Sequence, residues 1–317
     1  PSSSPAASPS SPAVSAGAAP AFSGGWYVDC SASDDFVEAY ERQPEEALRD
    51  WRCGDLSAAV LRERMTIACI GDSTTHGLNV ARGEEYPSVL HRLLSKQFPK
   101  QFNVINLGVT SSSARHDGNH SYWKFPQWSI AAEARIDIAV VMLGLNDAYH
   151  LGWAQEEYER DYLEMVQEIL RLHSNATIIV AVPPQGAYAF RNDKVRGGGD
   201  WALRLTRRSL AQAVEKVRSA AQLETPAINF FDIFARAASL KPNAVVKYPG
   251  PSITADELYL KDGIHPSALG YSEMAAAAAA AISKDAMSTR SFRLSCESSA
   301  HPDLCKAFCN NAGKAKS

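Results

Sequence analysis

The sequence has no marked excess of charge of either sign: 32 lysine and arginine residues stand against 35 aspartate and glutamate residues, a formal net charge of −3. A nucleic-acid partner would call for a basic excess or stripe, so we expect none. Long apolar runs are also lacking. The longest, Met274 to Ile282, is alanine-rich and far short of the ~18 residues that a membrane-spanning helix needs, so we expect no transmembrane segment. Hydrophobic and charged contents of 45% and 21% are typical of a soluble globular protein.

Residues 1–25 lack charge altogether and consist almost entirely of proline, serine, alanine and glycine. Such a segment cannot bury enough apolar surface to offset its conformational entropy, so we predict a disordered linker. It has neither the basic start nor the apolar core of a signal peptide. Because the chain begins at Pro1 and not at methionine, we expect that an upstream segment was removed.

Cysteine is scarce and unevenly placed. The six cysteines are Cys30, Cys53, Cys69, Cys296, Cys305 and Cys309. Cys69 lies in an apolar run and is predicted to be a buried free thiol. The other five flank the central region, as disulfides of an oxidising compartment would, although five is an odd number to pair. A zinc site in the C-terminal tail is the alternative, but its spacing matches no common zinc finger, so we expect no metal. Its ligands would be Cys296, His301, Cys305 and Cys309.

Two N-glycosylation sequons, beginning at Asn119 and Asn175, point to the same compartment. We therefore expect a secreted or lumenal protein. The chain divides into a linker (1–25), an N-terminal extension with Cys30 and Cys53 (26–64), a central domain (65–283) and a cysteine-containing tail (284–317).

Short apolar runs alternate with longer periodic ones through the central domain. The short runs are apolar on both faces and rich in β-branched residues, as strands buried in a parallel sheet should be. They are residues 65–70, 103–107, 137–143, 177–182 and 227–233. Helical patterns occupy residues 84–94, 158–170 and 203–217, and a last one opens at Pro266. This alternation predicts an α/β fold with about five parallel strands and helices on both faces.

Ligands of such folds bind beyond the carboxyl ends of the strands. Here Gly71-Asp72-Ser73 follows the first strand, residues 108–120 the second and residues 144–147 the third, while Asp262 and His265 precede the last helix. Each segment alone fits an ordinary turn or helix cap. Together they supply what ester hydrolysis needs: a nucleophile, a base, a group that orients the base, and oxyanion donors. A carboxylate three residues before a histidine can turn back to hold its ring in one tautomer.

The segments GDSTTHG, GLND and DGIHP, in this order and at strand ends, resemble blocks I, III and V of the GDSL/SGNH hydrolase superfamily. The resemblance spans roughly residues 65–283. It implies a flavodoxin-like, three-layer α/β/α sandwich. It also implies a serine esterase that works through an acyl-enzyme intermediate, without a metal or cofactor.

By this resemblance, Ser73 corresponds to the nucleophile, His265 to the general base and Asp262 to the residue that orients it. The side chain of Asn146 and the backbone N–H of Ser73 correspond to two oxyanion donors.

The third oxyanion donor of the family is a glycine N–H, five residues after an asparagine at the end of the second strand. Counting from Asn106 gives Ser111, which departs from the family pattern. Serine keeps the N–H, but it restricts the backbone if the position needs a positive φ.

Aromatic residues follow two of these motifs, at residues 120–128 and at Tyr149 and Trp153. Tyrosine and tryptophan can stack on sugar faces and keep a polar group for hydroxyls, although their rings could equally pack the loops onto the sheet. We take Asp72, Trp123 and Tyr149 as candidate substrate contacts. The expected substrate is a short-acyl, acetyl-type ester of a small molecule or carbohydrate, and we expect a monomer.

Three other functions stay open on the same residues. The first is a lysophospholipase, lipase or general carboxylesterase. The second is a binding protein on this fold, catalytically impaired by the serine at position 111. The third is an acyltransferase, in which a sugar hydroxyl replaces water.

Overall fold

The computed structural model describes residues 65–98, 101–149, 153–184, 209–238 and 255–284. The predicted linker, N-terminal extension and tail lie outside these residues, as does every cysteine except Cys69. Cys69 is a fully buried free thiol, as predicted. Asn119 and Asn175 are both exposed, and their glycosylation stays a prediction.

Strands and helices alternate along the described part of the chain. Its strands are β1 (Met65–Gly71), β2 (Phe102–Gly108), β3 (Ile138–Met142), β4 (Thr177–Val182) and β5 (Ile228–Asn229). Its α-helices are α4 (Ser73–His76), α5 (Tyr86–Gln97), α6 (Pro126–Glu133), α7 (Leu145–Tyr149), α8 (Gln155–Leu172), α10 (Ala211–Ala220), α11 (Phe230–Ala238) and α12 (Ala268–Lys284). Two 3₁₀ turns are η1 (Tyr122–Lys124) and η4 (Ala255–Leu258). Among these helices, none is both long and apolar enough to cross a membrane.

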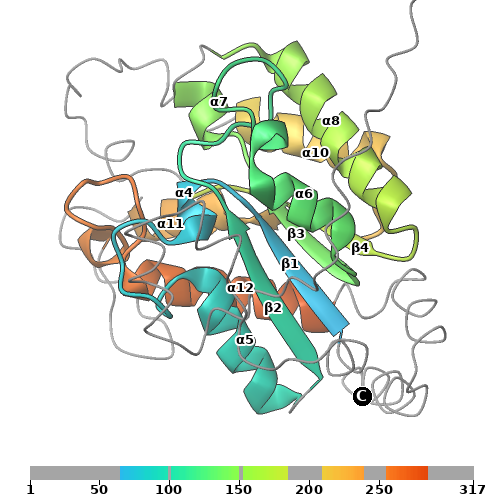
Figure 1. Ribbon diagram of the computed structural model, residues 1–317. Coiled ribbons are helices and arrows are strands. Elements are labelled where there is room, and N and C mark those ends of the chain that lie inside the picture. The colour runs from blue at the N-terminus through green and yellow to red at the C-terminus, as the bar shows by residue number, and fades with distance from the viewer. Residues whose placement is uncertain (1–64, 99–100, 150–152, 185–208, 239–254, 285–317) are drawn as a thin grey trace, which may run out of the picture.

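The five strands form one parallel sheet in the order β2-β1-β3-β4-β5 (Figure 1). Ile67 of β1 pairs with Val104 of β2 on one side and with Ile138 of β3 on the other. The chain therefore leaves β1 first toward one edge and later returns to its other side. The crevice at such a reversal is where ligands bind in doubly wound sheets of this flavodoxin-like order. The predicted fold class is confirmed.

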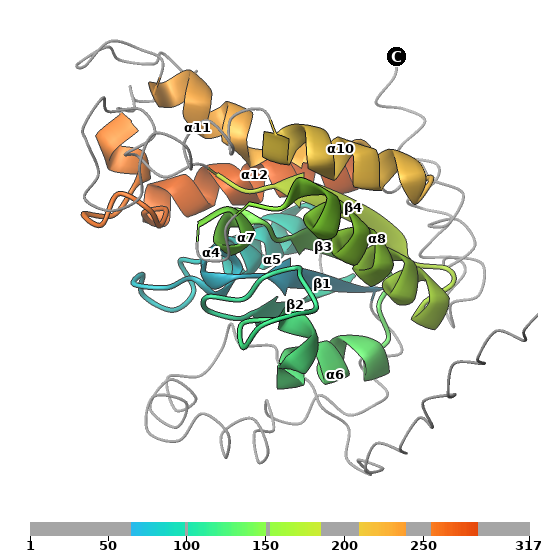
Figure 2. The same cartoon turned by 90° about the horizontal axis from the view of Figure 1, so that it is seen from above.

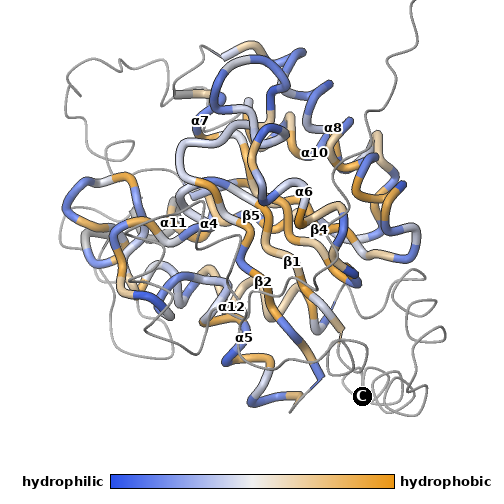
Figure 3. The backbone as a smooth tube through the Cα atoms, viewed as in Figure 1, coloured by the Kyte–Doolittle hydropathy of each residue, from blue (hydrophilic) through white to orange (hydrophobic). Residues whose placement is uncertain are grey.

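Helices cover both faces of the sheet, with α5 beside α12 on one face and α8 beside α10 on the other (Figures 1 and 2). The side chains of β1 alternate between the two layers. Ile67 and Cys69 pack with α5 and α12, whereas Ala68 and Ile70 pack with α8 and α10. Because both faces are buried, β1 and β4 are hydrophobic along their lengths (Figure 3).

The fifth predicted strand, residues 227–233, is mostly wrong. Only Ile228 and Asn229 pair with β4, and α11 begins at Phe230. The Asn229 side chain accepts a hydrogen bond from the N–H of Asp232 at 2.9 Å, which favours a helix start over a longer strand. The four-residue spacing of the buried Phe230 and Phe234 fits the helix.

The helical predictions need smaller corrections. Residues 158–170 lie within α8 and residues 86–94 within α5. Of the 203–217 pattern, residues 203–208 lie outside the described residues, and Ala211 onward lies in α10. The last helix begins at Ala268 and not at Pro266, which instead forms an isolated bridge with Tyr259. Helix α6 falls in a segment for which no helix was predicted from the sequence.

Candidate active site

Ser73 lies at the carboxyl end of β1, at the point where the sheet order reverses. The strand ends at Gly71, Asp72 caps the short helix α4, and Ser73 is the first residue of that helix. The Asp72 carboxylate accepts the N–H of Thr74 at 2.9 Å and so sets the direction of this turn. Ser73 is largely buried, with 7% of its surface exposed.

Three side chains that are distant in the sequence form one hydrogen-bonded chain. The Ser73 Oγ lies 3.0 Å from His265 Nε2, and His265 Nδ1 lies 2.8 Å from Asp262 Oδ2. An ionised carboxylate only accepts, so Nδ1 carries the hydrogen and Nε2 is the acceptor that faces the serine hydroxyl. The structure thus brings together the residues that the sequence predicts as nucleophile, base and orienting carboxylate.

Asp262 is held by its own turn as well as by the histidine ring. Its second oxygen, Oδ1, accepts the N–H of Ile264 at 2.8 Å and that of His265 at 3.0 Å. Partial burial opposes ionisation of this carboxyl, but these hydrogen bonds and that of the histidine ring outweigh it and hold the pKa of Asp262 below its usual value. Asp262 therefore stays ionised through the neutral range.

The loop that carries Asp262 and His265 is closed by backbone contacts. The N–H of Leu260 donates to the carbonyl of His265 at 2.9 Å, and the N–H of Gly263 donates to the carbonyl of Leu260 at 2.9 Å. Gly263 has φ +68°, a conformation that glycine adopts at little cost. The loop is therefore a compact, hydrogen-bonded turn.

Asn146, the predicted side-chain oxyanion donor, lies in α7 next to the end of β1. Its Nδ2 donates to the carbonyl of Ser112 at 2.9 Å and lies 3.4 Å from Asp72 Oδ2. The first distance is that of an ordinary hydrogen bond and the second is long, so one amide hydrogen is only weakly bonded. Asn146 is therefore placed between the Ser73 turn and the loop after β2.

Ser111 lies in that loop, which we call the β2 loop (residues 109–121). It is the third residue of a turn that closes with the Ser112 N–H on the Val109 carbonyl at 3.2 Å, and its φ is +61°. Type II turns need a positive φ at this position, which glycine supplies most easily. The position thus has the requirement that explains the family glycine, and this chain meets it with a serine.

The end of β1 and the β2 loop are tied together. The Gly71 carbonyl accepts the Val109 N–H at 2.9 Å and the Ser112 hydroxyl at 3.3 Å. At Gly108 an added Cβ would lie 2.1 Å from the backbone nitrogen of His76, so only glycine allows this approach. Within the described residues, the backbone N–H groups of Ser73 and Ser111 have no hydrogen-bond partner.

Asp72 does not fit its predicted role as a substrate contact. It has no exposed surface, and its two oxygens face Thr74 and Asn146 behind the serine. Burial is the main cause that raises its pKa to about 6, although hydrogen bonds from Thr74 act in the other direction. Asp72 therefore stabilises the Ser73 turn from the protein interior and is not available to a ligand.

The raised pKa of Asp72 predicts how stability depends on pH. Since its folded pKa of about 6 exceeds its unfolded value of about 4, the native state binds more protons between these values. The free energy of unfolding should therefore fall as pH rises from about 4 to about 6, by on the order of 2 kcal/mol from this residue. Asp72→Asn keeps an acceptor for Thr74 but does not titrate, so urea unfolding should show a flatter pH dependence for the variant. Parallel pH curves for the two proteins would contradict this.

The structure describes the side chain of only one of the two aromatic candidates, Trp123. Trp123 donates its indole N–H to the carbonyl of Ala114 at 3.2 Å, stacks on His116 with centroids 4.1 Å apart, and lies 4.5 Å from Trp128. These contacts favour the interpretation that its ring packs the β2 loop onto the fold. Tyr149 ends α7, and its side chain is outside the described residues.

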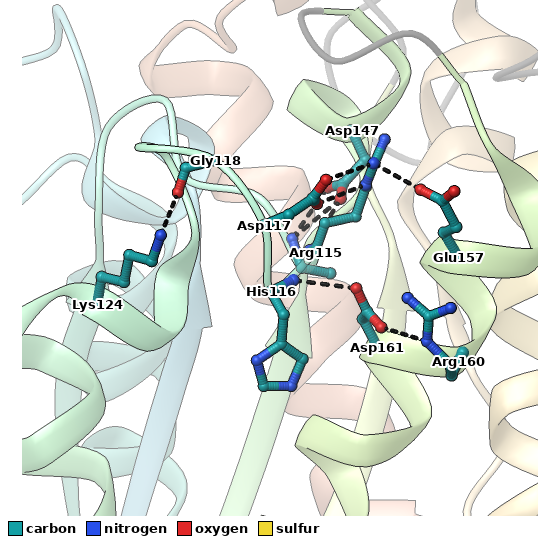
Figure 4. A network of polar contacts seen from close by, with 10 residues as sticks. Arg115, His116, Asp117, Gly118, Lys124, Asp147, Glu157, Arg160 and Asp161 are labelled. Carbon is teal, nitrogen blue, oxygen red and sulfur yellow. Dashed lines mark hydrogen bonds and ion pairs between the residues drawn. The ribbon is translucent and has the colours of Figure 1, made fainter.

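Two buried carboxylates near the site were not assigned a role from the sequence. Asp147 accepts the N–H groups of Ala114 and Arg115, and Asp161 accepts that of His116 (Figure 4). Burial is the main cause that raises the pKa of Asp147 to about 7, against these N–H bonds. Asp147 could have been noticed as part of GLND, and Asp161 as an acid on the apolar stripe of α8.

Comparison with known proteins gives the family. A family model described as the GDSL-like lipase/acylhydrolase family matches residues 69–272. The chain belongs to this family. Membership confirms the predicted resemblance.

Individual relatives are distant. An acetylxylan esterase of Xylanibacter ruminicola is 26% identical over 110 residues, which cover 34% of this chain and only 22% of that protein. A structure described as an arylesterase from Agrobacterium tumefaciens strain C58 is 17% identical, covers 69% of this chain and 98% of its own, and has a TM-score of 0.50. A lipase/acylhydrolase from Enterococcus faecalis is 22% identical over 69% of this chain and 95% of its own, with a TM-score of 0.49. At these identities the structural similarity concerns the fold.

Proposed function

We propose that the protein hydrolyses short-acyl esters, acetyl esters of carbohydrates in particular, through a covalent acyl-enzyme on Ser73. The observation that carries the proposal is the hydrogen-bonded chain from Asp262 through His265 to Ser73, at 2.8 and 3.0 Å. This is the arrangement of an activated nucleophile, in which a base contacts the hydroxyl and a third group orients the base.

In the proposed first half-reaction, Ser73 Oγ attacks the ester carbonyl carbon while its proton passes to His265 Nε2. The carbonyl electron pair moves onto oxygen, and Asp262 stabilises the imidazolium that forms. When the tetrahedral intermediate collapses, the bond to the alcohol breaks. The alcohol oxygen takes the proton from His265, and the acyl group stays on Ser73.

The oxyanion needs hydrogen-bond donors that are already in place when the charge develops. We assign the N–H groups of Ser73 and Ser111, which have no partner among the described residues, and the Nδ2 of Asn146. The Asn146 amide is fixed by Ser112 through one hydrogen, and its only other contact within the described part of the chain is the long one of 3.4 Å to Asp72 Oδ2, so the second hydrogen is assigned to the oxyanion.

In the second half-reaction a water molecule takes the place of the alcohol. His265 accepts a proton from the water as its oxygen attacks the acyl carbon, and the collapse of the second intermediate returns the proton to Ser73 Oγ. The products are a carboxylic acid and the free enzyme.

The acetyl and carbohydrate parts of the proposal are supported by the name of one relative, the acetylxylan esterase that is 26% identical over 110 residues. Of the two aromatic residues that the sequence offered for sugar stacking, Trp123 has its N–H engaged by Ala114 and its ring by His116, and the side chain of Tyr149 lies outside the described residues. The geometry of the site therefore supports ester hydrolysis, and the substrate class is tested by the second experiment below.

The test of the chemistry combines labelling with turnover. The full chain is treated with a fluorophosphonate, which reacts with activated serines, and the modified peptide is identified by mass spectrometry. We expect the label on Ser73. We also expect p-nitrophenyl acetate and butyrate to be hydrolysed faster than p-nitrophenyl octanoate. Absence of turnover on every ester would overturn the hydrolase proposal and favour the binding-protein alternative, whereas label on another serine would overturn the assignment of Ser73.

The test of the substrate class measures acetate released from acetylated xylo-oligosaccharides, with lysophosphatidylcholine as the lipid comparison. We expect release from the sugar ester and none from the lipid, and the reverse result would replace the carbohydrate proposal by a lysophospholipase. A polyol added as acceptor reports acyl transfer if acetylated polyol forms.

A further inference from the structure

The β2 loop is anchored at three consecutive backbone N–H groups by two carboxylates. The N–H groups of Ala114 and Arg115 donate to Asp147 at 3.1 and 3.2 Å, and that of His116 donates to Asp161 at 3.0 Å (Figure 4). Asp147 comes from α7 and Asp161 from α8. The loop is therefore fixed against two helices at once.

Both carboxylates are buried, unlike the neighbouring charged side chain of Asp117. Asp147 is 1% and Asp161 2% exposed, whereas the side chain of Asp117, which pairs with Arg115, is mostly exposed. A buried carboxylate is costly unless its oxygens are hydrogen-bonded, and exposed pairs contribute little. Simple attachment of a surface loop would not require two such groups.

The anchored segment begins next to the proposed oxyanion donors. Ser112, whose carbonyl accepts the Asn146 amide at 2.9 Å, lies two residues before Ala114. Ser111 precedes it at φ +61°, a conformation that residues other than glycine rarely adopt. A serine there needs surroundings that impose this conformation.

We propose that Asp147 and Asp161 are positioning residues for ester hydrolysis: by fixing residues 114–116, they keep Ser111 at positive φ with its N–H available to the oxyanion. The inference rests on the proposed function of Ser111. A chain with glycine at position 111 would depend less on these two carboxylates, because glycine adopts a positive φ without strain.

The primary variant is Asp161→Asn. Both oxygens of Asp161 accept, one from the His116 N–H at 3.0 Å and one from Arg160 Nε at 2.8 Å, so an amide must turn its NH₂ group toward one of these donors. We expect kcat for p-nitrophenyl acetate to fall about 10-fold with KM within about twofold, because the loss is of transition-state binding. Asp147→Ala, which leaves two N–H groups without their acceptor, should lower kcat about 10²-fold.

The matched control is Asp137→Asn. Asp137 is also 2% exposed, also accepts a backbone N–H, that of Thr66 at 2.9 Å, and also pairs with a nearby arginine, Arg135. It precedes β3, at the opposite end of the sheet from Ser73. We expect it to lose stability without a change in kcat.

The last arm is rescue by Ser111→Gly. If the carboxylates act by imposing the Ser111 conformation, Asp161→Asn should reduce kcat less than threefold in the Ser111→Gly background. An equal loss in both backgrounds, or a kcat of Asp161→Asn that matches that of Asp137→Asn, would overturn the inference while leaving hydrolysis by Ser73 intact. If the wild type itself shows no Ser73-dependent turnover, the proposed function fails first.

Discussion

Replacing Ser73 by alanine is expected to lower kcat/KM for p-nitrophenyl acetate by roughly 10⁴- to 10⁶-fold. The change removes the atom that would carry the acyl group, and His265 Nε2 then faces a methyl group in place of the hydroxyl at 3.0 Å. The residual rate would come from the oxyanion donors acting on a direct attack by water. The measurement is steady-state hydrolysis, with fluorophosphonate-treated wild type as the background.

The matched control for this change is Ser121→Ala. The Ser121 hydroxyl is buried and has no hydrogen-bond partner among the described residues, so its removal tests the loss of a buried hydroxyl away from the triad. We expect it to keep wild-type turnover. If Ser73→Ala retained more than about a tenth of the wild-type rate, Ser73 could not be the nucleophile.

Asp262→Asn is expected to lower kcat by about 10³- to 10⁴-fold, for a reason that the local geometry supplies. Asp262 Oδ1 accepts two backbone N–H groups, those of Ile264 and His265. An asparagine must keep its oxygen on these donors, so its NH₂ group turns toward His265 Nδ1. The ring then adopts the other tautomer, with its hydrogen on Nε2, and can no longer accept the Ser73 proton.

The comparison variant is Asn79→Ala, which removes a long contact of 3.5 Å from the Asn79 amide to Asp262 Oδ2. We expect it to change kcat by less than about threefold, because a hydrogen bond of this length is weak. Steady-state rates of both variants are measured with their far-ultraviolet circular dichroism. A folded Asp262→Asn protein with near wild-type kcat would show that Asp262 does not set the histidine tautomer.

The parallel sheet was predictable because its strands are buried on both faces and therefore read as short apolar runs. The run at residues 177–182 gives β4 without error. The run at 227–233 does not, because its phenylalanines are buried equally well by a helix, and the side chain of Asn229 decides between the two by capping α11. Short apolar runs alone do not distinguish these cases.

The positions of Ser73, Asp262 and His265 at strand and helix ends were predictable because the carboxyl edge of a parallel sheet gathers them. The direction in which each side chain points was not. Asp72 is adjacent to Ser73 in sequence, yet the turn that presents the serine sends the carboxylate into the interior. Adjacent residues of this tight turn point in different directions, and the sequence alone does not say which of them faces the interior.

The contacts of Asp147 and Asp161 depend on where the backbone N–H groups of residues 114–116 point. A loop without periodicity carries no pattern from which that direction follows. The sequence does place an acid, Asp161, between the buried Tyr158 and Tyr162 of α8, which is unusual for a stripe that packs on a sheet. Such an acid is a reason to look for a buried partner.

The brevity of β5 has a consequence for self-association. The outer strand of an open sheet presents unpaired N–H and C=O groups to which another chain can add, and a long edge is an aggregation hazard. β5 pairs with β4 through only two residues before α11 begins, so this edge offers too short a template for a further strand. Among the described strands, the seven-residue β2 at the opposite edge is the longer template for such an addition.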